Sequence, residues 1–378
     1  MVVTAAIWML FVAIAGWPPV RRGTLGFAVF VLTMTVNEIP LILLGVFVVS
    51  MVMTDHPVGM PATVAAAVCA AMVVGGLVWL QLRASSARAV LEAELERGLG
   101  IDWRASVGPA DTSAAGRLAG HWWRGILLPF QRRSHAVERS RNLRYGPDRA
   151  HRVDLYRTPS SSCGRPVLVH LHGGGFFQGG KSREGVMMLN RLAAHGWLCL
   201  SANYRLRSAG RHPNPLVDTK RLIAWIRDNA REHGADPTQV FIAGSSAGGH
   251  LAVSAALTSD RVALQPGFEA ADTSVAGVVV LYGYLGARTA DPSSSPALLA
   301  RPDAPPMLIV HGANDTAVPP ASAQAVAAAL RQVSRRPVVF VELPYTQHDF
   351  DFFASVRSRV TADAIEAFLN WARTHDGD

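Results

Sequence analysis

The stretch Gly244-Ser245-Ser246-Ala247-Gly248 decides the fold of this chain. The apolar run Gln239–Ala243 before it predicts a strand, and Ala247–Leu257 predicts a helix. A serine on a sharp turn between a strand and a helix has an exposed hydroxyl, and small neighbours allow the turn to form. The helix N-terminus behind it, with the Ala247 N–H, can stabilise a developing oxyanion. This pattern alone also fits an ordinary strand-to-helix turn, so the rest of the chain must decide.

Three further segments stand where a nucleophilic serine needs them. The loop His172-Gly173-Gly174-Gly175 follows a predicted strand, Pro166–Leu171, and its glycines can present adjacent N–H groups to one oxygen. Asp315 follows the predicted strand Met307–Val310, and His348 follows the last predicted strand. A serine hydroxyl requires a base for its proton and donors for the oxyanion. The chain order Ser, Asp, His is that of the α/β-hydrolase arrangement.

Other residues compete for the roles of base and acid. His311 ends a strand and His250 lies in the helix after the serine, so His348 is the preferred base. Asp349 and Asp351 are alternatives to Asp315. Their closeness in sequence to the histidine makes it difficult for them to orient its ring from behind.

The glycine loop has alternatives of its own: a flexible connection or a phosphate cradle. No P-loop lysine and serine pair stands at the required spacing, which disfavours phosphate binding. We expect His172 to hold the loop by hydrogen bonds and His170 to be structural.

From about residue 151 onward, strands alternate with helices, which predicts an α/β fold whose mostly parallel sheet is covered by helices on both faces. The expected strands are Val153–Arg157, Pro166–Leu171, Trp197–Ala202, Gln239–Ala243, Val275–Leu281, Met307–Val310 and Pro337–Glu342, and the expected helices are Pro215–Arg231, Ala247–Leu257, Ala321–Val333 and Ser355–His375.

Residues 1–82 predict a transmembrane helical region of about three spans. Its apolar stretches are Val2–Trp17, Thr24–Thr54 and Pro61–Leu82, and the last is long enough to cross a ~30 Å hydrocarbon core. A cleaved signal peptide is the alternative for the first stretch, but no Lys or Arg precedes it. The middle stretch fits either one helix kinked at Pro40 or a hairpin that re-enters the membrane.

The flanking charges predict the orientation. With three spans, Arg21 and Arg22 and the arginines after residue 82 place the catalytic region in the cytoplasm, whereas a hairpin would reverse this. Glu38 is either a functional residue at membrane depth or, as we favour, part of a helix break at an interface.

Residues 83–142 predict a linker with cap helices. Trp122 and Trp123 are interleaved with arginines up to Arg133, which is typical of a helix in the headgroup layer and equally of a cap helix on the catalytic domain. The chain of 378 residues carries a net charge of +8, concentrated near this region. Anionic lipids are therefore more plausible partners than nucleic acid, for which no binding signature exists.

The segments 143–378 resemble the hormone-sensitive-lipase branch of the α/β-hydrolases. The motifs that carry the resemblance are His172-Gly-Gly-Gly175, Asn203-Tyr-Arg-Leu206, Asp236-Pro237, Gly244-Ser-Ser-Ala-Gly-Gly249, Asp315 with Val318-Pro319, and His348-Asp-Phe350. The membrane-anchored arrangement also resembles mycobacterial Lip-type esterases, which implies a multi-pass protein of a bacterial cell membrane, and more distantly plant prenylcysteine methylesterases.

The resemblance assigns roles to single residues. It implies that Ser246 is the nucleophile, His348 the base and Asp315 its orienting acid. It also implies that the N–H groups of Gly174, Gly175 and Ala247 form the oxyanion hole; His172, Gly173, Gly244 and Gly248 support these motifs.

The sequence therefore predicts a membrane-anchored serine carboxylesterase or lipase that acts on a lipid-like ester. The alternatives are a membrane acyltransferase or deacetylase that uses the same triad on a lipid or glycolipid and, less favoured because the triad is intact, a non-enzymatic interaction module. We expect no cofactor, and the cysteines, Cys69, Cys163 and Cys199, lack metal-ligand spacing.

Overall fold

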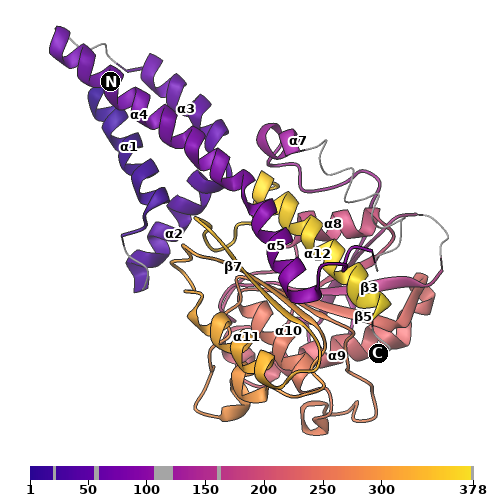
Figure 1. Ribbon diagram of the computed structural model, residues 1–378. Helices are drawn as coiled ribbons and strands as arrows, with labels where there is room; N and C mark the ends of the chain where they lie inside the picture. The colour runs from indigo at the N-terminus through magenta and orange to yellow at the C-terminus, as the bar shows by residue number, and fades with distance from the viewer. Residues whose placement is uncertain (20–22, 55–58, 106–121, 160–162, 376–378) are drawn as a thin grey trace.

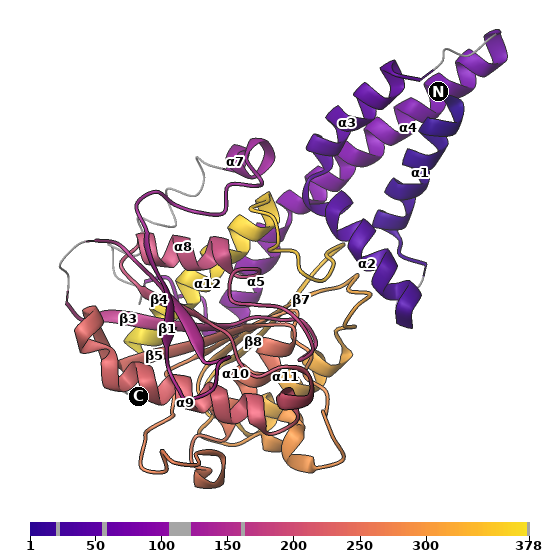
Figure 2. The same ribbon diagram turned by 180° about the vertical axis from the view of Figure 1, so that it is seen from behind.

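The computed structural model describes residues 1–19, 23–54, 59–105, 122–159 and 163–375. It has two regions: an α/β body that holds the C-terminus, and a bundle of N-terminal helices that extends away from it (Figures 1 and 2).

The body is built on an eight-stranded sheet with the order β1-β2-β4-β3-β5-β6-β7-β8. The six strands from β4 to β8 in this order are parallel, and β2 pairs antiparallel with both β1 and β4. The strands are β1 (Glu138–Arg144), β2 (Arg152–Arg157), β3 (Arg165–Leu171), β4 (Leu198–Ala202), β5 (Ala235–Ser245), β6 (Val278–Leu281), β7 (Met307–Gly312) and β8 (Val338–Leu343).

Helices cover both faces of this sheet, as predicted. Side chains alternate along each buried strand, so that Val167 and Val169 of β3 join one core while Leu168 joins the other. The first core packs against α9, α10 and α11, and the second against α5, α8 and α12. These helices are α5 (Ala87–Leu99), α8 (Val186–Ala194), α9 (Asn214–Asn229), α10 (Ala247–Leu257), α11 (Ala321–Val333) and α12 (Val356–Thr374); short 3₁₀ turns are η2 (Arg207–Gly210), η3 (Arg231–His233), η4 (Val262–Leu264), η5 (Pro292–Ser294) and η6 (Pro296–Leu299).

The predicted boundaries of the linker fall inside a helix and a strand of the structure. Residue 82 lies inside α4 (Met60–Ser85), and residue 142 lies inside β1. Leu91 and Leu95 of α5 are almost fully buried in the second core. The α/β body therefore extends back to α5 and does not begin at residue 143.

The N-terminal helices are α1 (Val2–Gly16), α2 (Gly23–Glu38), α3 (Pro40–Val52) and α4. In the described part of the chain, one continuous helical stretch, Met60–Leu99, is long and apolar enough to cross a membrane, and 22% of its most apolar window is buried within the molecule. Such a helix is weak evidence for a membrane anchor, because signal sequences and core helices share its composition.

The expectation of about three spans is not supported. The break at Pro40, which cannot continue the hydrogen-bond ladder, separates α2 from α3, and their axes differ by 95°. The 15 residues of α1 extend about 22 Å, short of a ~30 Å hydrocarbon core. Apolar composition alone did not show where these helices end.

Candidate active site

Ser246 occupies a sharp turn between β5 and α10. Its φ of 51° lies in the left-handed region, and its amide donates to the carbonyl of Leu281 at 2.9 Å. A Cβ at Gly244 would lie 2.1 Å from the carbonyl oxygen of Gly248, and a Cβ at Gly248 would lie 2.1 Å from that of Leu171. Glycines at both positions therefore allow β5, β3 and α10 to approach closely enough to form the turn.

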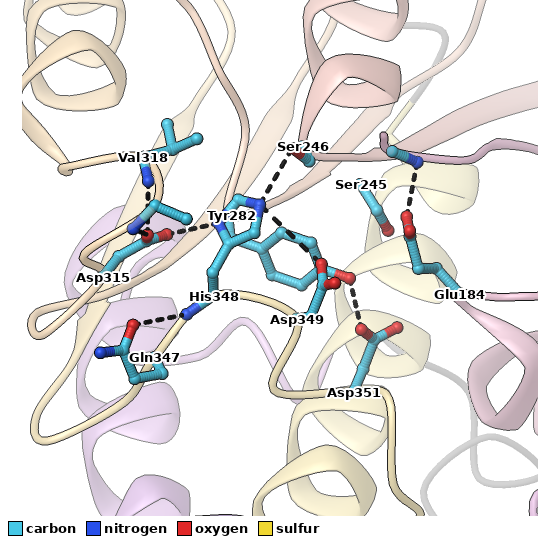
Figure 3. Close-up of polar contacts among 12 residues, drawn as sticks. Glu184, Ser245, Ser246, Tyr282, Asp315, Val318, Gln347, His348, Asp349 and Asp351 are labelled. Atoms are coloured by element: carbon cyan, nitrogen blue, oxygen red, sulfur yellow. Dashed lines mark hydrogen bonds and ion pairs between the residues drawn. The ribbon is translucent and has the colours of Figure 1, made fainter. Parts of the chain in front are cut away.

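The structure brings together the predicted serine, histidine and aspartate (Figure 3). The Nε2 atom of His348 lies 2.9 Å from the Oγ of Ser246, and its Nδ1 lies 2.6 Å from the Oδ2 of Asp315. All three side chains are buried, and Ser246 is 7% exposed. This is the geometry in which an imidazole can take a hydroxyl proton while a carboxylate holds its tautomer.

Asp315 is fixed by its own loop after β7. Its Oδ1 accepts hydrogen bonds from the amides of Ala317 at 3.0 Å and Val318 at 2.7 Å. Burial disfavours the charged carboxylate, but His348 and His311 outweigh this cost and lower the pKa of Asp315. The acid is therefore ionised at neutral pH.

The same pair shifts the histidine in the opposite direction. Burial disfavours the charged ring of His348, but the neighbouring Asp315 carboxylate more than offsets it and raises the pKa of His348. An imidazolium formed at this position would thereby be stabilised.

The alternative bases and acids have other partners. The Nε2 of His311 lies 2.8 Å from the carbonyl oxygen of Val318, and the Nε2 of His250 lies 3.0 Å from that of Ser294. Asp349 lies 3.8 Å from the Nε2 of His348, on the serine side of the ring, and pairs with Arg183. The remaining candidate, Asp351, accepts hydrogen bonds from the Tyr282 hydroxyl and the Gly185 amide.

The glycine loop lies beside the serine. Both Gly174 and Gly175 have positive φ angles, 107° and 63°. Among the described residues, the amides of Gly174, Gly175 and Ala247 have no hydrogen-bond acceptor, whereas that of Gly173 donates to Glu184 Oε2 at 2.5 Å. Free amides on the loop and at the start of α10 are what an oxyanion hole requires.

His172 and His170 have structural contacts, in line with the expectation for them. The Nδ1 of His172 donates to the Gly173 carbonyl at 2.6 Å, and its ring stacks on Tyr204. His170 lies 3.1 Å from the Oγ of Ser245. Burial lowers the pKa of His170 to about 3 and that of His172 to about 4, so both rings are neutral.

Sequence reasoning missed two groups in this site. The first is Glu184, whose carboxylate accepts a hydrogen bond from the Gly173 amide. Burial, together with the charges of Asp349 and Asp351, raises the pKa of Glu184. The second is Phe30 of α2, whose ring meets that of His348 edge-on with 5.6 Å between centroids. Neither position belongs to a motif, so one sequence carried no signal for them.

Helices of the N-terminal bundle make further contacts at the site. The Thr316 hydroxyl, next to Asp315, donates to the Gly26 carbonyl at 2.9 Å, and Asn314 Nδ2 donates to the Gly16 carbonyl at 3.4 Å. Helix α2 thus forms part of the cover over His348, a role that the sequence suggested for the linker. Among the described residues, no cluster of His, Cys, Asp and Glu is arranged to hold a metal ion.

The chain is similar in sequence to known ester hydrolases. LipM of Mycobacterium tuberculosis, named as a probable carboxylic ester hydrolase, is 33% identical over 95% of this chain and 90% of its own length. The esterase LipQ of the same organism is 34% identical over 78% of this chain and 76% of its own length. A family model described as BD-FAE matches residues 153–289.

Solved structures agree in fold. An esterase of Thermogutta terrifontis with bound butyrate superposes with a TM-score of 0.54 at 21% identity, covering 62% of this chain and 94% of its own. A carbohydrate esterase from gut microbiota gives 0.53 at 19% identity, over 62% of this chain and 99% of its own. With its α/β-hydrolase fold and its similarity to LipM over nearly the whole length, the chain belongs to the Lip-type carboxylic ester hydrolases of the hormone-sensitive-lipase-like branch.

Proposed function

We propose that this carboxylic ester hydrolase works through an acyl-enzyme on Ser246. The observation that carries the proposal is the hydrogen-bonded chain from Asp315 through His348 to Ser246. His348 takes the proton of Ser246 as its Oγ attacks the ester carbonyl, then returns that proton to the leaving alkoxide. Water, activated by the same histidine, attacks the acyl-enzyme and releases the acid.

The oxyanion of each tetrahedral intermediate is held by backbone amides. Gly174, Gly175 and Ala247 offer N–H groups that have no acceptor among the described residues. Donors fixed before the reaction need no rearrangement as charge develops, which makes them effective in a buried site. Glu184 positions this loop through its contact with Gly173.

The catalytic body is attached to a membrane through α4. The apolar part of this helix is largely exposed, which suits a surrounding of acyl chains. Arg83 lies in the last turn of α4 and Arg88 follows it, so the positive-inside rule favours the cytoplasmic side for the body. The domain plan is thus a membrane-associated helical region, a connecting segment that contains α7 (Trp122–Leu127), and a hydrolase body that includes α5.

The substrate is an ester that partitions into the bilayer. Phe30, which is 3% exposed, lies against the catalytic histidine and belongs to a helix of the apolar region. An acyl chain that enters between α2 and the body meets apolar side chains, whereas a small soluble ester gains little from this cover. Membrane lipids are therefore both the surroundings and the source of substrate.

The full-length protein in detergent and in liposomes tests these proposals. A fluorophosphonate probe should label the wild type and not Ser246→Ala, and the protein should resist extraction by carbonate. Hydrolysis of an ester series of increasing chain length should be faster for long chains, and faster in liposomes than in detergent. Free acid as the product distinguishes hydrolysis from acyl transfer. Equal rates for all chain lengths in both media would refute the proposal of a lipid-like substrate but not the proposal of esterase activity.

A further inference from the structure

A basic cavity of about 440 Å³ opens on the body away from the triad. It lies between the segment that contains α7 (Trp122–Leu127), helix α8 and the first turns of α12. Five arginines line it, with no aspartate or glutamate among the lining residues: Arg124, Arg132, Arg133, Arg191 and Arg359.

Two of these arginines are already occupied. Arg191 forms ion pairs with Asp363 at 2.8 Å and Glu366 at 2.9 Å. Arg132 donates to the carbonyls of Arg183 and Phe352 at 2.9 and 3.2 Å. The two carboxylates balance the charge of Arg191, whereas the carbonyl oxygens occupy N–H groups of Arg132 without neutralising its charge.

The other three form no ion pair in the described part of the chain. Arg124 donates to the Gln131 side-chain oxygen at 3.2 Å and Arg359 to the Ala354 carbonyl at 3.0 Å, which leaves the remaining N–H groups of both guanidinium groups available. Among the described residues, no carboxylate lies within ion-pair distance of Arg124, Arg133 or Arg359. The Nε of Arg124 is buried and has no hydrogen-bond acceptor in the structure. Burial and the charges of Arg124 and Arg191 lower the pKa of Arg359, although the Asp363 carboxylate partly opposes them. A bound anion would satisfy all of these groups at once.

The surface next to the cavity is apolar. Trp123, Leu127, Leu128 and Phe130 expose 44%, 64%, 41% and 65% of their surface. In both views α7 lies beside the start of α12, at the end of the body from which the helical bundle extends (Figures 1 and 2). Aromatic and aliphatic side chains beside arginines are typical of a surface that lies in lipid headgroups.

We propose that this arginine pocket binds the phosphate group of an anionic phospholipid headgroup. Guanidinium groups bind phosphate oxygens through paired, charge-assisted hydrogen bonds, and the exposed side chains of α7 would contact the acyl chains of the same leaflet. Bound lipid would hold α7, and with it the start of α12, against the membrane. The inference rests on the membrane attachment proposed above, but not on the catalytic mechanism.

The test uses the full-length protein in a neutral detergent, with lipid retention measured by native mass spectrometry and affinity by titration. The probes are phosphatidylglycerol, phosphatidylcholine and inorganic phosphate. We expect the wild type to retain phosphatidylglycerol in preference to phosphatidylcholine. Arg133→Gln with Arg359→Gln should weaken this binding by about tenfold or more for each arginine lost. Arg261→Gln, an exposed arginine after α10, is the matched control and should change nothing.

Single Arg133→Glu, at an exposed side chain, provides a second variant that leaves the packing intact. Equal retention of phosphatidylglycerol by wild type and by both variants would overturn the proposal. Tight binding of inorganic phosphate without lipid preference would also overturn it, by assigning the pocket to a soluble phosphate. Hydrolysis of a short soluble ester, recorded in parallel, should stay at the wild-type rate. A result against lipid binding in the pocket is then distinguishable from a result against the proposed esterase mechanism.

Discussion

The α/β body and the N-terminal bundle bury their apolar residues in different ways. In the body, strands such as β3 and β5 are almost fully covered by helices on both faces, and the sheet hydrogen bonds fix their positions. In the bundle, many large apolar side chains remain exposed, among them Leu10, Val49 and Val64. The body thus contains its own core, whereas the bundle leaves much of its apolar surface uncovered by protein. The two regions meet where Phe30 of α2 contacts His348, so changes on either side should affect the proposed reaction.

The largest effect on activity should come from a substitution in the body. Replacing Ser246 with Ala removes the nucleophile, and kcat on a short p-nitrophenyl ester should fall by about 10⁶-fold. Binding of the ester to the variant should persist, because the pocket is unchanged. A variant with substantial remaining turnover would contradict the acyl-enzyme mechanism. It would also mean that the two regions do not meet at the catalytic site.

Asp315→Asn should lower kcat by about 10⁴-fold, because the amide cannot stabilise the imidazolium. In the wild type, kcat/KM should rise with pH as His348 loses its proton, with the midpoint above the ordinary pKa of about 6.5. Activity is lost as the pH falls through this pKa, since the protonated ring cannot act as a base. In the variant the midpoint should move to lower pH, and an unchanged midpoint would show that another group orients the ring.

The buried ion pair between the bundle and the body should contribute strongly to the stability of the folded protein. Glu38 at the end of α2 pairs with Arg357 of α12 and accepts a hydrogen bond from Ser355 at 2.6 Å, all within buried surroundings. Arg357→Met leaves a buried carboxylate unpaired and should lower the free energy of unfolding by about 3–5 kcal/mol. The double variant Glu38→Met with Arg357→Met should recover most of this loss.

Thermal and denaturant unfolding in detergent measure these differences. Arg301→Met is the control, because its partners Asp260 and Asp303 are largely exposed, and it should cost less than about 1 kcal/mol. If Arg357→Met is no worse than this control, the bundle and the body are not coupled through this pair.

The smallest expected effect is a change in the preference for long-chain over short-chain esters. Phe30→Leu keeps an apolar contact with His348 but removes the aromatic edge, so we expect kcat/KM for long-chain esters to change about two- to tenfold with little change for short ones. Leu25→Val, at a largely exposed position on the same helix, is the control. Equal effects of both substitutions on all chain lengths would show that α2 does not contribute to substrate choice.

The sequence predicted the body better than the bundle, for physical reasons. Helices Ala247–Leu257 and Ala321–Val333 begin and end where they were expected, because turn residues and apolar periodicity marked both ends. Strand β1 was missed: its residues, Glu138–Arg144, are mostly polar, as suits an edge strand that is exposed on much of its surface.

In the bundle, the alternatives for Glu38 could not be resolved from sequence. A helix break does follow it, between α2 and α3, yet its side chain also pairs with an arginine 319 residues away. Local patterns carry no information about such distant partners. The same holds for Phe30 and Glu184, whose importance depends on what the fold brings beside them.

The partnership between Glu38 and Arg357 also sets an order of events during synthesis. At about 5–20 residues per second, the ribosome needs roughly 16–64 s to add the 319 residues that separate them. During this interval the nascent chain carries a carboxylate at the end of its second helix with no arginine to receive it. The contact between α2 and α12 can therefore form only after α12 has been synthesised, which makes the joining of the bundle to the body a late step.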